Sequence, residues 1–173
     1  MKKVIYLLVV GMLLSNCESK IVKSEKVDTA QEKEAVTILL DNWHKSAAEA
    51  NFETYFNAMT SNSVFIGTDA SENWNYTQFK EFSKPYFDKG KAWNFTAIQR
   101  NIYVKNKVAW FDELLDTHMG ICRGSGVLTK SENGWGIEHY VLSLTIPNDN
   151  IDEIKLINKE KDSIFLSSIK NLY

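Results

Sequence analysis

Residues 109–143 contain three strand-like runs: AWFDELL at residues 109–115, CRGSGVL at 122–128 and GWGIEHYVLS at 134–143. Short turn signals separate the runs, so they predict consecutive antiparallel strands. Ionisable side chains interrupt each run. A carboxylate on a half-buried strand is costly unless it is paired or has a chemical role. The stretch therefore predicts a curved sheet with a polar floor.

The elements on either side of this stretch complete an α+β order. Helices are predicted from apolar spacing at residues 29–51, 52–59 and about 79–90, and a helical segment is expected after Pro147. Strands are predicted at residues 64–67, 93–104, 108–116, 121–130 and 135–146. The expected fold class is α+β: a cone-like fold of a curved, mostly antiparallel sheet packed on N-terminal helices, with an extra C-terminal helical segment.

The start of the chain has the features of a secretory signal. Lys2 and Lys3 precede an apolar run that is shorter than the about 20 residues of a membrane-spanning helix. The run ends in Leu14-Ser15-Asn16-Cys17, which resembles the lipobox of bacterial lipoproteins, whose cysteine is acylated. An ordinary cleaved signal with a chance cysteine is the alternative.

This reading predicts a signal peptide over residues 1–16, then lipidated Cys17 and a polar tether over residues 17–28. The expected location is the bacterial cell envelope, on the periplasmic or outer-surface side, with the membrane contacted through the lipid on Cys17. The only other cysteine, Cys122, then has no disulfide partner. A packed thiol is its expected role.

Composition argues against several classes of partner. The chain has 20 basic and 22 acidic residues and no basic cluster, so no nucleic-acid partner is expected. Its three histidines fall on separate elements, and no His-x-x-x-His or Cys-x-x-Cys spacing occurs. We therefore expect no metal and no cofactor.

Four local motifs carry a family resemblance: FIGTDASENW at residues 65–74, WFDE at 110–113, CRGSGVL at 122–128 and LSLTIPND at 142–149. Together with the order of elements, they resemble the SnoaL-like family of the nuclear transport factor 2-like superfamily. The resemblance implies a SnoaL-like domain over residues 29–149, with residues 150–173 as a C-terminal helical extension. The superfamily includes cyclases, isomerases, dehydratases and non-catalytic adaptors, so the resemblance does not assign a reaction.

The strand register sorts polar residues between the two faces of the sheet. A symmetric turn centred near His118 would place Trp110 and Asp112 opposite two glycines, on one face with His139 and Ser143. Asp112 and His139 are thus the candidate catalytic residues in a concave pocket. Resemblance to cyclases and isomerases implies that such a group abstracts a proton next to a carbonyl. A structural Asp–His hydrogen bond is the alternative.

The same register places Glu113 and Arg123 together on the other face as a cross-strand ion pair. The alternative is that Arg123 points inward and binds a carboxylate ligand. His44 borders the apolar stripe of the first helix and is expected at the solvent edge. The candidate pocket wall comprises Trp43, Phe65, Trp74, Tyr86, Trp110, Ser143 and Arg123.

Three functions fit these observations. The first is an envelope lipoprotein whose cone binds a small, largely apolar molecule, since 12% of the residues are aromatic and ligand pockets are mostly apolar. The second is a cofactor-free isomerase, cyclase or lyase that uses Asp112 and His139, and the sequence leaves open whether the chain is an enzyme. The third is a non-catalytic dimerisation or interaction module. A homodimer is expected from the family resemblance.

Overall fold

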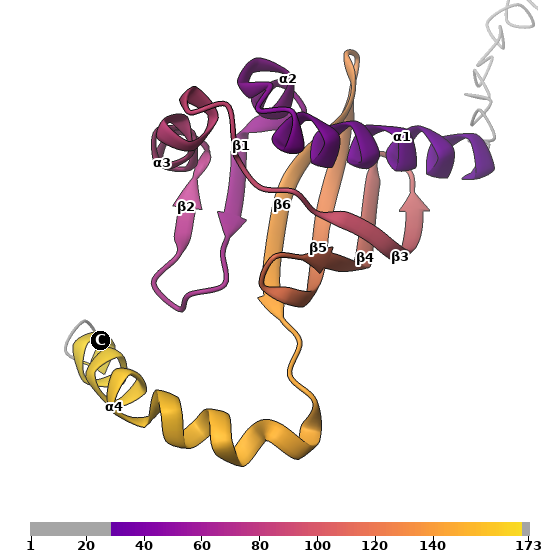
Figure 1. Cartoon of the computed structure of the whole chain (residues 1–173). Coiled ribbons are helices and arrows are strands. Elements are labelled where there is room, and N and C mark those ends of the chain that lie inside the picture. The colour runs from indigo at the N-terminus through magenta and orange to yellow at the C-terminus, as the bar shows by residue number, and fades with distance from the viewer. Residues whose placement is uncertain (1–28, 171–173) are drawn as a thin grey trace, which may run out of the picture.

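The structure, a computed structural model, describes residues 29–170 (Figure 1). The predicted signal peptide, Cys17 and tether lie outside the described residues. The α-helices are α1 (Thr29–Ala48), α2 (Phe52–Asn57), α3 (Tyr76–Asp88) and α4 (Ile151–Lys170). The strands are β1 (Met59–Ile66), β2 (Asn73–Asn75), β3 (Thr96–Lys105), β4 (Val108–Thr117), β5 (Gly120–Ser131) and β6 (Gly134–Leu144).

The six strands form one curved sheet in the order β2-β1-β6-β5-β4-β3. Every neighbouring pair is antiparallel except β1 and β6, which run parallel. Helix α1 crosses one face of this sheet, and α2 and α3 lie beside β1 and β2 (Figure 1). The predicted fold class, an α+β cone with a C-terminal helix, is confirmed. Strand β2 was not predicted.

The core lies between the sheet and the helices α1, α2 and α3. Four apolar residues at helical spacing on α1, Val36, Leu40, Trp43 and Ala47, are buried. Alternate residues of β4 are buried against them, since successive side chains of a strand point to opposite faces. Aromatic rings supply much of this core; the Phe65 and Phe79 rings stack with centroids 3.9 Å apart.

The β4–β5 hairpin differs from the predicted register by one residue. Thr117 pairs with Gly120, so the turn comprises only His118 and Met119. Gly120 has a φ of 96°, which favours glycine, and the Thr117 hydroxyl accepts a hydrogen bond from the Met119 N–H. The turn is therefore centred between two residues rather than on His118. The predicted pairing was wrong, and the consequences for the site are large.

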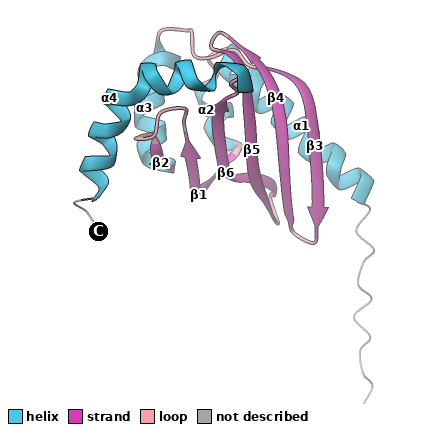
Figure 2. Ribbon diagram, turned by 90° about the horizontal axis from the view of Figure 1, so that it is seen from below, coloured by secondary structure: helices cyan, strands magenta, loops and turns pink. Residues whose placement is uncertain are grey.

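Helix α4 stands apart from the rest of the fold. None of its residues is buried within the described part of the chain. Seen from below, it runs across the end of the cone from the β6 side toward β2 (Figure 2). Over residues 29–170, the helices lack the combination of length and apolar content that crossing a bilayer requires.

Candidate functional site

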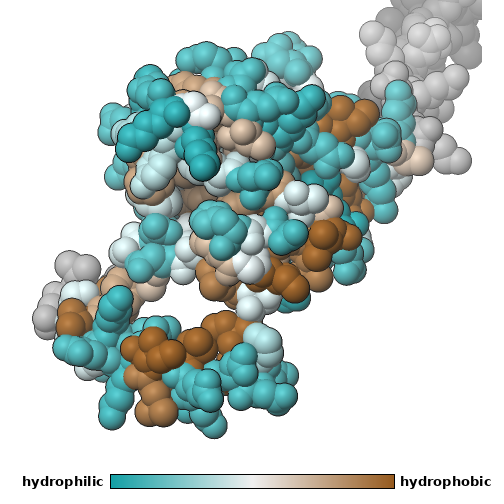
Figure 3. Space-filling model, viewed as in Figure 1, coloured by the Kyte–Doolittle hydropathy of each residue, from teal (hydrophilic) through white to brown (hydrophobic). Residues whose placement is uncertain are grey.

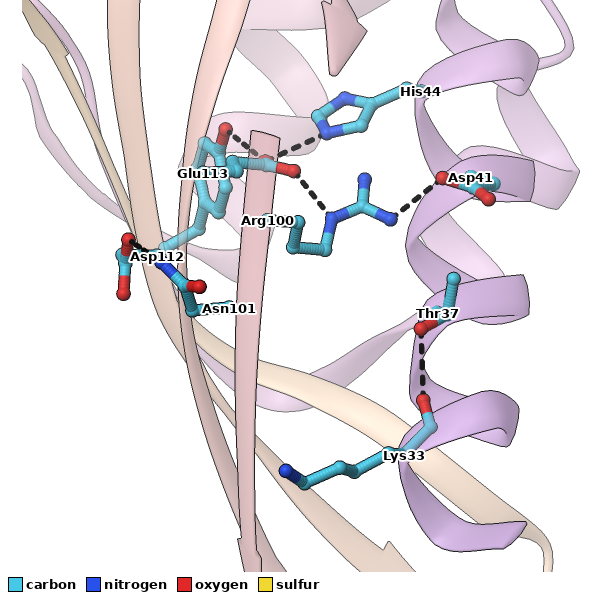
Figure 4. Close-up of polar contacts among 9 residues, drawn as sticks. Lys33, Thr37, Asp41, His44, Arg100, Asn101, Asp112 and Glu113 are labelled. Carbon is cyan, nitrogen blue, oxygen red and sulfur yellow. Dashed lines mark hydrogen bonds and ion pairs between the residues drawn. The ribbon is translucent and has the colours of Figure 1, made fainter. Parts of the chain in front are cut away.

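A buried carboxylate lies at the centre of the interior. Glu113 on β4 is 1% exposed. His44 Nε2 and the Tyr140 hydroxyl donate to its Oε1 at 2.8 and 3.1 Å, and Arg100 Nε donates to its Oε2 at 2.8 Å. Arg100 also donates to Asp41 at 2.6 Å (Figure 4). We call these five residues the Glu113 cluster; it joins α1, β3, β4 and β6.

The cluster keeps Glu113 ionised. Burial alone would raise the pKa of its carboxyl, but the hydrogen bonds and positive charges of His44 and Arg100 outweigh burial and lower the pKa below its ordinary 4.5. Burial alone would lower the pKa of Arg100, but the negative charges of Glu113 and Asp41 outweigh burial and raise this pKa. Burial and the nearby Glu113 charge raise the pKa of Tyr140. These groups therefore form a charged network in which both oxygens of Glu113 accept hydrogen bonds, whereas Arg100 Nη2 is buried without a hydrogen-bond partner.

Gly124 has no side chain, which leaves space for the Glu113 and Tyr140 side chains. Gly124 pairs with Glu113 across the β4–β5 ladder. A Cβ atom at position 124 would lie 2.8 Å from Glu113 Oε1 and closer still to the Tyr140 hydroxyl. A glycine on a strand thus allows a carboxylate and a phenol to meet above the backbone.

A separate pocket lies between the β1–β2 loop and the β4–β5 turn. These two segments are at the lower end of the domain in Figure 1. The volume of the pocket is about 140 Å³. Six of its twelve wall residues are aromatic; the wall consists of Phe65, Gly67, Thr68, Glu72, Trp74, Phe79, Phe82, Trp93, Phe95, His118, Met119 and Leu142. We call it the aromatic pocket.

The walls of the aromatic pocket are held by stacking and by the β1–β2 loop. Trp74 stacks on Phe82 with ring centroids 4.4 Å apart. In the loop, the Asp69 N–H donates to Glu72 Oε2 at 3.1 Å, which folds the Glu72 carboxylate back over Gly67. Glu72 and His118 are the ionisable groups of the wall, and the remainder is suited to an apolar occupant.

A more polar groove adjoins the aromatic pocket. It is lined by Ala48, Lys91, Ala92, Trp93, Asn94, Thr96, Asp116, Thr117 and His118. Trp93 and His118 belong to both linings, so these two side chains separate the pocket from the groove. Most of the groove's other residues are exposed, as expected for a surface depression.

The predicted catalytic pair does not lie in the aromatic pocket. Asp112 pairs with Ser125, not with Gly124, and so lies on the sheet face opposite the Glu113 cluster. There it accepts a hydrogen bond from Asn101 Nδ2 at 3.0 Å. His139 lies on the same outer face, paired with Val127. The prediction that these two residues share one face was right, but their placement inside the cone was wrong.

The remaining predicted wall residues lie in four environments. Phe65 and Trp74 line the aromatic pocket. Trp43 is buried in the core, where it stacks on Tyr55 at 4.9 Å. Tyr86 is exposed on α3. Trp110, Ser143 and Arg123 project from the outer face or its end, because the one-residue register shift exchanges the faces of β4 relative to β5.

The predicted Glu113–Arg123 ion pair is also wrong. Arg123 pairs with Leu114 and is exposed, and the cation that neutralises Glu113 is Arg100 from β3. His44 was expected at the solvent edge but is buried. It follows Leu40 by four positions and precedes Ala47 by three, so it lies on the apolar face of α1. That spacing is the sequence signal that could have identified His44.

Within residues 29–170, His, Cys, Asp and Glu side chains form no group of three that could hold a metal ion. The absence of a cofactor stays a prediction.

The profile of the SnoaL-like domain family matches residues 36–147. Solved structures share the fold at low sequence identity. An NTF2-like protein of unknown function from Pseudomonas putida KT2440 has a TM-score of 0.58 and 12% identity, covering 70% of this chain and 91% of its own. A cystatin-like domain of unknown function from Nostoc punctiforme has a TM-score of 0.57 and 14% identity, covering 83% and 99%. No curated protein matches the chain significantly.

Proposed function

The chain belongs to the SnoaL-like domain family, and from that premise we propose that its domain binds a small, largely apolar molecule in the aromatic pocket. The observation that carries this proposal is the pocket wall, which combines six aromatic rings with few ionisable groups. Such walls are typical of small-molecule sites, in which apolar contact supplies affinity and a few polar groups fix orientation.

Volume sets the size of the proposed ligand. The pocket measures about 140 Å³, and an engineered apolar cavity of about 150 Å³ in another protein binds benzene. One aromatic ring, or an aliphatic group of similar bulk, therefore fits. Glu72 and His118 would contact a polar substituent of that molecule. A larger ligand would have to extend through the open end.

The contacts favour binding over catalysis by the Glu113 cluster. A general base needs a pKa near the working pH and a free oxygen within reach of the substrate. The pKa of Glu113 is lowered, both of its oxygens already accept hydrogen bonds, and it is not part of the aromatic pocket wall. Catalysis by Asp112 and His139 lacks support as well, because they lie on the outer face.

Calorimetric titration of the full chain with indole tests the binding proposal. We expect saturable binding by the wild type and loss of binding in Met119→Trp, because a bulky ring from the β4–β5 turn would fill the pocket. Ile98→Trp, at an exposed apolar residue outside the pocket wall, is the matched control and should bind normally. Equal binding by all three proteins, or none by the wild type, would overturn the proposal.

We also propose that the mature protein is anchored in the bacterial cell envelope by acylation of Cys17. The support is the sequence alone: a basic start, a short apolar run and a lipobox-like end. In cells fed an alkyne-tagged fatty acid, the wild type and Cys122→Ala should carry the label and sediment with membranes. Cys17→Ser should do neither. Equal labelling of Cys17→Ser would exclude this anchor.

A further inference from the structure

Helix α4 carries apolar side chains that nothing in the described chain covers. Ile157 is 73% exposed and Ile164 is 64% exposed, although both are large aliphatic residues. A solitary helix with an uncovered apolar stripe is marginally stable in water, since most helical stability comes from packing that stripe. The stripe on α4 therefore requires a partner surface.

The attachment of α4 places it at the open end of the cone. The chain leaves β6 through Thr145, whose N–H and hydroxyl both donate to the Ile121 carbonyl, at 3.0 and 2.7 Å. Ile121 is the second residue of β5, which begins at the β4–β5 turn that borders the aromatic pocket. Figures 1 and 2 agree that α4 then passes below this end of the domain.

The middle of α4 reaches the opposite side of the pocket mouth. The β1–β2 loop forms that side, and its Asp69 has a lowered pKa, chiefly through hydrogen bonds from Ser71 and in smaller part through the positive charge of Lys161 on α4. Lys161 therefore lies near the loop. Ile157 and Ile164 are four positions before and three positions after Lys161, so they share its side of the helix.

Two apolar surfaces face each other across open space. Figure 3 shows apolar side chains on the side of α4 that is turned toward the domain, and apolar side chains on the edge of the domain above it. Leu144 and Ile146, at the exit of β6, are exposed apolar residues of that end. Leu144 lies two positions after Leu142 of the pocket wall and so on the same sheet face.

Charge favours the domain as the partner of α4 over an anionic membrane. The helix has four lysines against two aspartates and two glutamates, a net charge of zero. Interfacial membrane helices usually carry an excess of cations on their polar face. The positive charge of Lys161, by contrast, contributes to the lowered pKa of Asp69, which indicates that α4 lies near the β1–β2 loop.

We propose that α4 is a lid that closes over the aromatic pocket, with Ile157 and Ile164 packing on the pocket rim and on Leu144 and Ile146. Closure removes these apolar groups from water and encloses whatever occupies the pocket. Thr145 stays held to Ile121, and the residues between Thr145 and the start of α4 act as the hinge. The role of the lid rests on the proposed function, because a lid needs a ligand to enclose. The closing movement itself can be measured without a ligand.

Hydrogen exchange of the full chain, followed by mass spectrometry, tests the movement. In the Ile157→Gln/Ile164→Gln variant, glutamine replaces the two isoleucines. Glutamine is a good helix former, so α4 keeps its helix propensity but loses its apolar contact with the domain. We expect its amides over residues 151–170 to exchange about tenfold faster than those of the wild type. Lys159→Gln/Ser163→Gln, on the other side of α4, should exchange as the wild type does.

Stopped-flow release of indole tests the enclosure. The Ile157→Gln/Ile164→Gln protein should release indole about tenfold faster than the wild type and the control. If no protein binds indole, the binding proposal fails while the exchange result still decides the movement. Equal exchange in all three proteins overturns the lid. Protection of α4 that increases with protein concentration would also overturn the lid, because it indicates that a second copy covers the helix. Protection that requires lipid vesicles would overturn it as well, because it indicates that a membrane covers the helix.

Discussion

At the residue scale, Glu113 is the interior side chain whose burial requires the most free energy. Burying a carboxylate requires strong compensation, and His44, Arg100 and Tyr140 provide it through three hydrogen bonds. A buried ion pair adds little net stability over an apolar replacement, but removal of one partner leaves the other uncompensated. Removal of one member of the cluster is therefore expected to cost more stability than replacement of all its members by apolar residues.

Glu113→Gln keeps the shape of the side chain and removes its charge. Arg100 then loses its buried anion and keeps only the exposed Asp41, and we expect a loss of about 3 kcal/mol in the free energy of unfolding. Asp112→Asn, the neighbouring acid on the outer face, should change stability by less than about 0.5 kcal/mol. Urea unfolding measures both. A Glu113→Gln protein as stable as Asp112→Asn would contradict the role given to the cluster.

The lowered pKa of Glu113 predicts acid sensitivity. Its ordinary value is 4.5, and the folded value lies lower. At pH values between the folded and the unfolded pKa, Glu113 binds more protons in the unfolded state than in the folded state. The free energy of unfolding therefore rises with pH in this range, and the contribution of Glu113 is lost as the pH falls through the folded pKa. Urea midpoints recorded from about pH 6 down to about pH 3 should fall more steeply for the wild type than for Glu113→Gln. Parallel curves would show that another group governs acid unfolding.

At the scale of elements, the sequence predicted the strands but not their register. The runs ending near Asp116 and beginning near Ile121 are plain in the pattern. The predicted turn is centred on His118, and the observed turn is centred between His118 and Met119, a difference of one residue in the pairing. The positive φ of Gly120 and the hydrogen bond accepted by the Thr117 hydroxyl fix the observed turn. Because side chains alternate, that one residue moved Asp112 out of the cone and Glu113 into it.

A second local irregularity changed the last strand. The pairing of β5 with β6 shifts between Val127 and Leu128, so Glu138 is an extra residue between His139 and Ile137. Its carboxylate accepts hydrogen bonds from Thr60 and Thr129. The bulge turns His139 onto the outer face, whereas Ile137 keeps the pairing with Leu128 that the turn predicts and was misplaced only by the shift between β4 and β5. Bulges depend on such tertiary partners and cannot be predicted from alternation alone.

Gly124→Ala tests the close approach of β4, β5 and β6. An added methyl would overlap the Tyr140 hydroxyl and Glu113 Oε1. We expect a loss of about 2 kcal/mol in the free energy of unfolding, because both partners are held in the cluster and cannot move freely. Ser125→Ala, on the adjacent outer-face position, should be nearly neutral. Thermal unfolding of both variants is the measurement, and equal midpoints would contradict the prediction.

At the scale of the molecule, the two faces of the sheet differ in what covers them. The inner face packs on α1 around the Glu113 cluster. The outer face leaves Trp110 43% exposed, stacked on Tyr103 with ring centroids 5.8 Å apart. The order of helices and strands in the sequence was enough to predict this architecture. The location of the pocket was not, because it depends on turns and loops meeting from β1, β4 and α3.

The outer face supports the expected homodimer. Exposed aromatic pairs are frequent anchors of interfaces, so we propose that Tyr103 and Trp110 contact a second copy. Light scattering at micromolar concentration should give a dimer for the wild type and a monomer for Trp110→Lys. Ile38→Lys, at an exposed apolar residue of α1, should remain dimeric. A monomeric wild type would exclude this interface.

The Glu113 cluster also imposes an order on biosynthesis. His44 and Glu113 are 69 residues apart, and Tyr140 follows 27 residues later. A ribosome releases the chain N-terminus first, so α1 emerges long before the strands that neutralise and cover its polar groups exist. Loop closure over such separations is slow. The attachment of α1 to the sheet therefore stays incomplete until β6 has emerged, and until then the nascent chain leaves Glu113 without its hydrogen bond from Tyr140.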